Sequence, residues 1–149
     1  MADELNNPDA VIAIFEEATE ANLDASCRKG SMNDNPMHFQ RLIELANLGD
    51  DPGQLPRKHL TLHELIHSDR LINGMDFSYR MLAKVARLKT KFPEHVHMLI
   101  ANHEMAQMLK SGILKDGVKC VEAFQEALMY VFGDEAGRVE ASIDRFIRS

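Results

Sequence analysis

A five-residue segment, His63-Glu64-Leu65-Ile66-His67, carries the side chains of a zinc site and matches the pattern H-E-x-x-H. On a helix this spacing places two imidazoles one turn apart, where they bind zinc, and the glutamate is the base that activates a metal-bound water. One hypothesis is therefore a zinc metallopeptidase with His63 and His67 as metal ligands. The preceding residues, KHLTL, alternate like a strand, which is not the helical context that such a site requires.

A second polar group follows an extended apolar run, in the segment VHMLIANHE. Asn102, His103 and Glu104 come directly after residues that are rich in Val, Ile and Leu, and this composition predicts a strand. In open parallel sheets, ligands bind beyond the carboxyl ends of the strands. Amide, imidazole and carboxylate groups bind metal ions or protons, so these three residues lie where chemistry is expected.

The two segments together resemble a known family. FPEHVHMLIANHE is similar to the segment of the YPENVFLLRGNHE type in calcineurin-like metallophosphoesterases, the fold of the serine/threonine protein phosphatases. That family carries a G-D-x-x-D-R-G motif upstream at a strand end, and HELIHSD stands at the matching position here. The resemblance covers residues 33–132 and implies a single metallophosphoesterase-like domain, residues 1–149, that is truncated relative to the family.

The resemblance assigns roles to the residues at matching positions. In the family, the first aspartate of the upstream motif bridges two metal ions, the asparagine of G-N-H-E binds one metal, and its histidine protonates the leaving group or steadies the phosphate. Glu64 thereby matches the bridging carboxylate, Asn102 the metal ligand and His103 the catalytic imidazole. His67 matches the outer acidic residue and is the second catalytic candidate, and His63 is a further candidate metal ligand.

The activity implied by the resemblance is metal-dependent hydrolysis of a phosphate ester. Two divalent ions (Mn, Fe or Zn) neutralise the phosphate and lower the pKa of a bound water, which then attacks in line. The family's first motif, G-D-x-H, matches residues 30–33, where Ser31 and Asn33 replace the aspartate and the histidine. A two-metal centre loses function when its ligand geometry is incomplete. We therefore expect phosphate-ester hydrolysis as the ancestral activity, and one alternative is that this chain is inactive and binds no metal.

Two further interpretations need no phosphatase chemistry. Asn102 can cap the following helix by accepting a hydrogen bond from the Met105 amide, with Glu104 stabilised by the helix dipole. A half-sheet leaves an unpaired strand edge and an uncovered apolar face, which favours a non-catalytic helical protein that self-associates as a homo-oligomer. His95 and His97 alternate on one face of the predicted strand and are expected to face solvent.

The spacing of apolar residues predicts a chain dominated by helices, with Asn7 and Asp76 as N-terminal caps and Gly133 as a C-cap. HLTLHELIH is ambiguous between a strand and a helix start. A helix between two strand-like segments predicts a βαβ unit, so the expected fold class is α/β: helix-rich with a small parallel sheet, resembling part of the metallophosphoesterase fold. The predicted helices span residues 6–25, 36–48, 75–92, 118–133 and 135–149, and the predicted strand spans residues 94–101.

Composition sets the broad class. The hydrophobic fraction of 45% and the charged fraction of 27% are those of a globular protein. A net charge of −6 disfavours nucleic-acid binding, which depends on clustered Lys and Arg, and no apolar run approaches the length of a membrane span. Cys27 and Cys120 are isolated from each other, and the acidic N-terminus is unlike a signal peptide. These features predict a cytoplasmic protein with reduced thiols.

Overall fold

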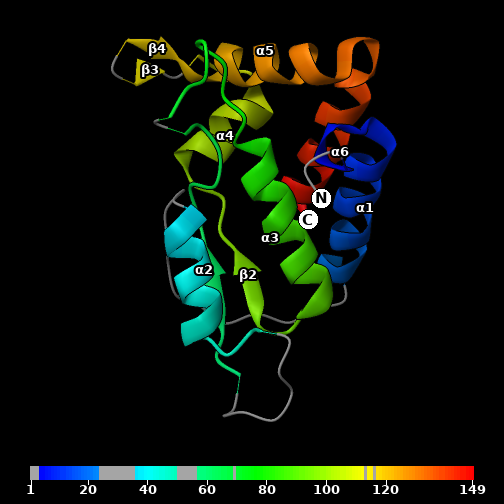
Figure 1. The fold of residues 1–149 in the computed structure, drawn as a ribbon, viewed down its shortest axis with the longest axis vertical. Helices are drawn as coiled ribbons and strands as arrows, with labels where there is room; N and C mark the ends of the chain where they lie inside the picture. Colours follow the sequence, from blue (N-terminus) through cyan, green and yellow to red (C-terminus); the bar gives the residue numbers. More distant parts are fainter. Residues whose placement is uncertain (1–3, 24–35, 50–56, 69, 113, 116) are drawn as a thin grey trace.

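A computed structural model describes residues 4–23, 36–49, 57–68, 70–112, 114–115 and 117–149 (Figure 1). The positions of Ser31 and Asn33, and of Cys27, lie outside the described residues. Helices make up most of the described chain, as predicted. They are η1 Glu4–Asn6, α1 Pro8–Leu23, α2 Pro36–Leu45, α3 Tyr79–Lys91, α4 Asn102–Leu109, α5 Cys120–Phe132, η2 Gly133–Glu135 and α6 Ala136–Arg148. The strands are β1 Leu60–Leu62, β2 Val96–Met98, β3 Leu114–Lys115 and β4 Val118–Lys119.

The helix ends follow local sequence signals. The Asn7 side chain caps α1 by accepting a hydrogen bond from the Ala10 amide at 3.1 Å. Asp76 accepts a hydrogen bond from the Ser78 amide at 2.9 Å, and because this turn precedes the helix, α3 begins at Tyr79, later than predicted. Gly133 ends α5 with a φ of 53°, a left-handed conformation that glycine adopts without strain.

Two strands form the parallel sheet, and α3 connects them. β1 and β2 pair in parallel with Leu60 opposite Val96 and Leu62 opposite Met98, which confirms a helix-rich α/β fold with a small parallel sheet. β3 and β4 form a separate antiparallel hairpin. The helix predicted to start at Val118 starts instead at Cys120, because Val118 and Lys119 pair with the preceding strand.

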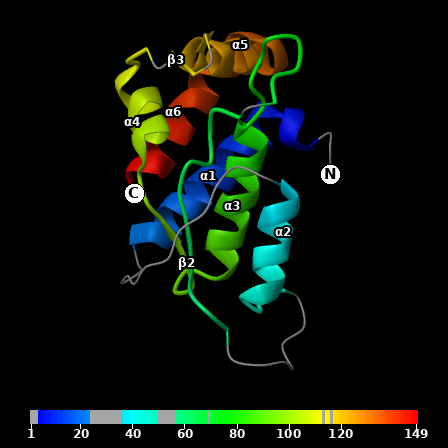
Figure 2. The same ribbon diagram turned by 90° about the vertical axis from the view of Figure 1, so that its left-hand side faces the viewer.

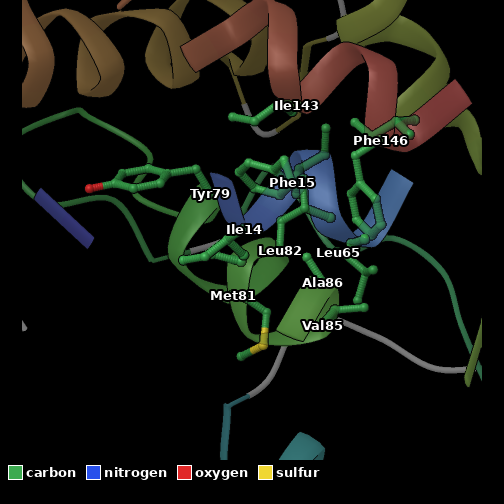
Figure 3. Close-up of a cluster of buried hydrophobic side chains, with 14 of the residues drawn as sticks. Ile14, Phe15, Leu65, Tyr79, Met81, Leu82, Val85, Ala86, Ile143 and Phe146 are labelled. Carbon is green, nitrogen blue, oxygen red and sulfur yellow. The ribbon is translucent and has the colours of Figure 1, made fainter. Parts of the chain in front are cut away.

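The helices pack in layers around α3. Figure 1 shows α3 between β2 and α1, and Figure 2 shows α2 beside α3. α1 packs against both α3 and α6. The core between these helices contains Phe15, Leu82 and Ile143, all fully buried or nearly so (Figure 3). No helix among the described residues is long and apolar enough to span a membrane.

The prediction that His97 faces solvent is wrong, because both faces of β2 are covered and the side chain is only 4% exposed. The Nε2 atom of His97 lies 2.9 Å from Nδ1 of His59, and the His59 ring stacks on the rings of both His95 and His97. Lys89, also buried, donates a hydrogen bond to the Val96 carbonyl at 2.8 Å. Burial is the largest cause of a lowered pKa of His97, and the charges of Lys89, His59 and His95 lower this pKa further.

This pKa shift predicts a pH-dependent stability. Because the folded state disfavours protonated His97, the unfolded state binds more protons below the ordinary histidine pKa of 6.5. The free energy of unfolding should therefore be highest above pH 6.5 and fall as the pH drops toward the lowered pKa. Urea unfolding between pH 5 and 8 measures this slope, which should flatten in His97→Gln. The exposed His38 on α2 supplies the control, His38→Gln, and an equal flattening there would assign the slope to another group.

Candidate metal site

The residues after β1 carry the first histidine of the site and are not helical. No residue from His63 to His67 lies in a helix. Glu64 and His67 have φ angles of 54° and 62°, in the left-handed region that residues other than glycine rarely adopt. The helical spacing of two imidazoles that the metallopeptidase hypothesis requires is therefore absent, and the alternation of KHLTL was the correct indication.

The start of α4 carries the second histidine. Ala101 is the N-cap residue in an extended conformation, and the Met105 amide donates its hydrogen bond to the Ala101 carbonyl at 2.9 Å. The predicted cap bond from Met105 to the Asn102 side chain is therefore wrong. The capping carboxylate is that of Glu104, which accepts a hydrogen bond from the Ala101 amide at 3.2 Å.

The same carboxylate joins the two segments. Its second oxygen accepts a hydrogen bond from the Leu65 amide at 2.6 Å, and Glu104 is only 1% exposed. Because Leu65 lies between the two left-handed residues, Glu104 holds this irregular loop against the first turn of α4. The contact brings His67 next to His103.

Three potential metal ligands meet where the loop, α4 and α5 converge. The Nδ1 atoms of His67 and His103 are 3.1 Å apart. One ligand atom each from His67, His103 and Cys120 lies within 4.8 Å of the others. His67 and Cys120 are buried and His103 is partly exposed, so the cluster has a side open toward solvent.

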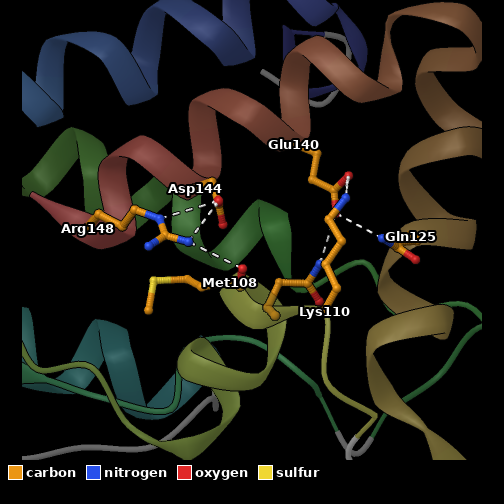
Figure 4. Close-up of polar contacts among 7 residues, drawn as sticks. Met108, Lys110, Gln125, Glu140, Asp144 and Arg148 are labelled. Carbon is orange, nitrogen blue, oxygen red and sulfur yellow. Dashed lines mark hydrogen bonds and ion pairs between the residues drawn. The ribbon is translucent and has the colours of Figure 1, made fainter.

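Hydrogen bonds fix which nitrogen of His67 faces the cluster. Gln107 donates its amide N–H to the Glu140 carboxylate at 3.2 Å, which turns its Oε1 atom toward Nε2 of His67 at 3.1 Å. Since Oε1 only accepts, Nε2 carries the proton and Nδ1 presents a lone pair to the cluster. Glu140 is held in turn by Gln125 at 3.1 Å and Lys110 at 3.3 Å (Figure 4). Metal-binding histidines have this arrangement, with the distant ring nitrogen donating to a fixed acceptor.

The loop backbone at His67 is fixed as well. The His67 amide donates a hydrogen bond to Oγ of Ser78 at 3.1 Å, and this hydroxyl donates to Asp76 at 2.9 Å. Burial raises the pKa of Asp76, although its hydrogen bonds with Ser78 oppose the rise. The Asp76 amide donates to the Ala123 carbonyl at 3.0 Å, which attaches the loop to α5, the helix that carries Cys120.

The chemical types of the donor atoms are those that zinc prefers. Two imidazole nitrogens bound to one tetrahedral zinc are about 3.3 Å apart, close to the 3.1 Å between the two Nδ1 atoms. Cys120 is the first residue of α5, where the helix dipole stabilises negative charge, and a thiolate is the form of cysteine that binds metal. Two imidazoles and a thiolate therefore suit zinc better than Mn, which prefers oxygen ligands.

The structure brings together two of the residues singled out in the sequence. His67 and His103 are in contact, whereas the Glu64 carboxylate is 4.0 Å from the His63 ring and neither of these belongs to the three-residue group found among the described residues. Asn102 is exposed at the first position of α4. Cys120 was not singled out as a ligand, because it is an isolated cysteine whose partners are distant in the sequence.

Comparisons of the chain with protein-family models, with curated proteins and with solved structures give no match. The fold and the site together define a helix-rich α/β protein with a partly buried His/His/Cys cluster that could hold a metal ion.

Proposed function

We propose that the protein binds one divalent transition-metal ion, zinc foremost, through His67, His103 and Cys120. The observation that carries this proposal is the convergence of three ligand atoms within 4.8 Å from three separate elements. The tautomer that Gln107 imposes on His67 supports it, because Nδ1, the atom that faces His103, then carries no proton.

The reaction that we propose for this site is the one implied by the sequence resemblance, metal-assisted hydrolysis of a phosphate ester. It is supported by the contact between His67 and His103, the two histidines that the resemblance places in the site, although in this proposal they bind the metal and do not take the catalytic roles they have in the family. Zinc with three protein ligands keeps one position for a water and lowers the pKa of that water to about 7. In this proposal the two histidines hold a single ion, and the partly exposed side of His103 is where substrate approaches.

Metal content tests the binding proposal. Protein purified without a metal-affinity step should contain one zinc ion per chain by elemental analysis. Zinc at about 100 times its dissociation constant should raise the free energy of unfolding by about 2.7 kcal/mol, and a chelator should reverse this effect. Metal-free protein whose stability does not respond to zinc would contradict the proposal.

Three variants assign the ligands. His103→Ala and Cys120→Ser should weaken zinc binding by more than the roughly 10- to 100-fold loss that follows removal of an outer hydrogen-bond partner. His38→Ala, at an exposed histidine on α2, should bind zinc as the unmodified chain does. Cobalt replaces zinc as a probe: a thiolate-to-cobalt charge-transfer band should appear in the unmodified protein and be absent in Cys120→Ser. A band that persists in this variant would exclude Cys120 as a ligand.

The same proteins separate catalysis from binding alone. Zinc-loaded protein is assayed for phosphate release from an aryl phosphate, and release should be lost in His103→Ala and retained in His38→Ala. Zinc binding without phosphate release would leave a structural metal site that joins the loop, α4 and α5, and would remove hydrolysis from the proposal.

A further inference from the structure

One face of α5 exposes large apolar side chains next to the residues that precede α3. Met129 and Tyr130 on α5 are 59% and 74% exposed, and Ile72 is 56% exposed. Soluble proteins seldom gather such side chains without a partner. We use the name Tyr130 face for this surface, which consists of Ile72, Met75, Phe77, Arg80, Glu122, Gln125, Glu126, Met129 and Tyr130.

Tyr130 stands between two open hollows of this face. One is lined by Ile72, Phe77 and Arg80, and the other by Met75, Glu122 and Glu126, and Tyr130 borders both. The Tyr130 ring meets the Phe77 ring edge-on at a centroid distance of 6.4 Å. The hollow on one side of the tyrosine thus contains a guanidinium, and the hollow on the other side contains carboxylates.

The charges at the two ends lack counter-charges within the described part of the chain. Arg80 donates to the Asn6 side chain at 3.0 Å and to the Tyr79 hydroxyl at 3.2 Å, and it lies over the Phe77 ring, but it contacts no described carboxylate. Glu126 is exposed and makes no ion pair with a described residue. Each end of the Tyr130 face therefore presents a charge that an oppositely charged group can neutralise.

We infer that the Tyr130 face binds the same face of a second copy of this chain, related by a two-fold axis near Tyr130. A two-fold axis brings each end of a surface against the opposite end of its copy. Here it places Arg80 of one copy opposite Glu126 of the other, twice, while Met129, Tyr130 and Ile72 become buried at the centre. Aromatic residues and methionine at the centre with charges at the rim are typical of protein interfaces. This inference goes beyond metal binding and does not depend on it.

Sedimentation over a range of protein concentrations tests the association. The unmodified chain should form a dimer, and Tyr130→Ala should weaken it by about ten-fold or more, as loss of a central aromatic residue does. Leu109→Ala is the matched control, because Leu109 is an apolar residue on α4 that is 65% exposed and lies outside the Tyr130 face. A chain that stays monomeric at all concentrations, or an equal effect of Leu109→Ala, would overturn the inference.

Charge reversal tests the two-fold arrangement. Arg80→Glu alone and Glu126→Arg alone should each weaken self-association, because each variant places like charges opposite each other. Mixing the two variants should give a heterodimer, since the carboxylate introduced into one chain then faces the guanidinium introduced into the other, and the remaining pair keeps its original charges. Circular dichroism verifies that each variant is folded. Folded variants that do not associate on mixing would rule out this pairing, and the surface would then be open to a different partner.

Discussion

Replacing Phe15 with alanine is expected to lower the free energy of unfolding by about 4 kcal/mol. Phe15 is fully buried on α1, the helix that packs against both α3 and α6. Its ring centroid lies 5.5 Å from that of Phe146 on α6 (Figure 3). Alanine removes the ring and leaves a cavity that neighbouring helices can fill only in part. Thermal unfolding should show a melting temperature lower by about 10 °C.

Two comparisons separate this packing effect from a helix effect. Glu17→Ala changes an exposed residue on the same helix and should alter stability by less than about 0.5 kcal/mol. A double-mutant cycle with Phe146→Ala should give a coupling energy of about 1 kcal/mol, since each ring loses its partner when the other is removed. A loss for Phe15→Ala as small as that for Glu17→Ala would mean that this ring does not contribute to the core.

Most of the helical framework could be predicted because its signals are local. Asn7 caps α1 and Gly133 ends α5 as the sequence indicated, since both signals act through hydrogen bonds and backbone angles within one turn. The strand β1 was ambiguous in the sequence. Its identity depends on the pairing of Leu60 with Val96, a contact between residues far apart in the chain. Periodicity within a short window carries no information about such a partner.

The same limit explains the errors at β2. Alternation predicted an exposed face for His97, but in a parallel strand both faces can be covered, and here they are. His97 contacts the His59 ring, and the charge of Lys89 lowers its pKa. Both interactions depend on the tertiary structure and not on the sequence around the strand. The strand itself was predicted correctly in type, although it spans only Val96–Met98.

The candidate site could be predicted in part. The sequence singled out His67 and His103, because each belongs to a recognisable segment of polar residues. It did not indicate Cys120, and it gave no sign that the loop before His67 adopts left-handed angles at Glu64. The loop with those angles is bound to Glu104 of α4 by a buried hydrogen bond, so the ligand set depends on the docking of elements that the sequence pattern describes only one at a time.

Replacing Glu104, whose carboxylate makes this contact with the Leu65 amide, by alanine is expected to lower the free energy of unfolding by about 3 kcal/mol. The substitution leaves the Leu65 amide without its acceptor and removes the hydrogen bond to the Ala101 amide. A buried donor without a partner is the larger part of the cost, at about 1–3 kcal/mol, and loss of the cap adds about 1 kcal/mol. Urea unfolding of the zinc-free protein measures this change independently of metal.

Glu104→Gln and Glu94→Ala make the interpretation specific. Glutamine keeps the shape of the side chain and one acceptor oxygen, so it can retain the bond from Leu65 while losing that from Ala101, and the loss should be about 1 kcal/mol. Glu94 is exposed, and its removal should have little effect. Equal losses for Glu104→Ala and Glu104→Gln would show that the Ala101 bond dominates.

Glu104 is also expected to affect zinc affinity. This residue is not in the three-residue ligand group, yet it holds the loop that carries His67 against the helix that carries His103. Glu104→Ala should therefore weaken zinc binding by about 10-fold even under conditions where the variant is fully folded, because binding must then order the loop. In Glu104→Gln, which keeps the Leu65 bond, the affinity should remain within a few-fold of the original. Unchanged zinc affinity in folded Glu104→Ala would mean that the left-handed loop holds its shape without this carboxylate.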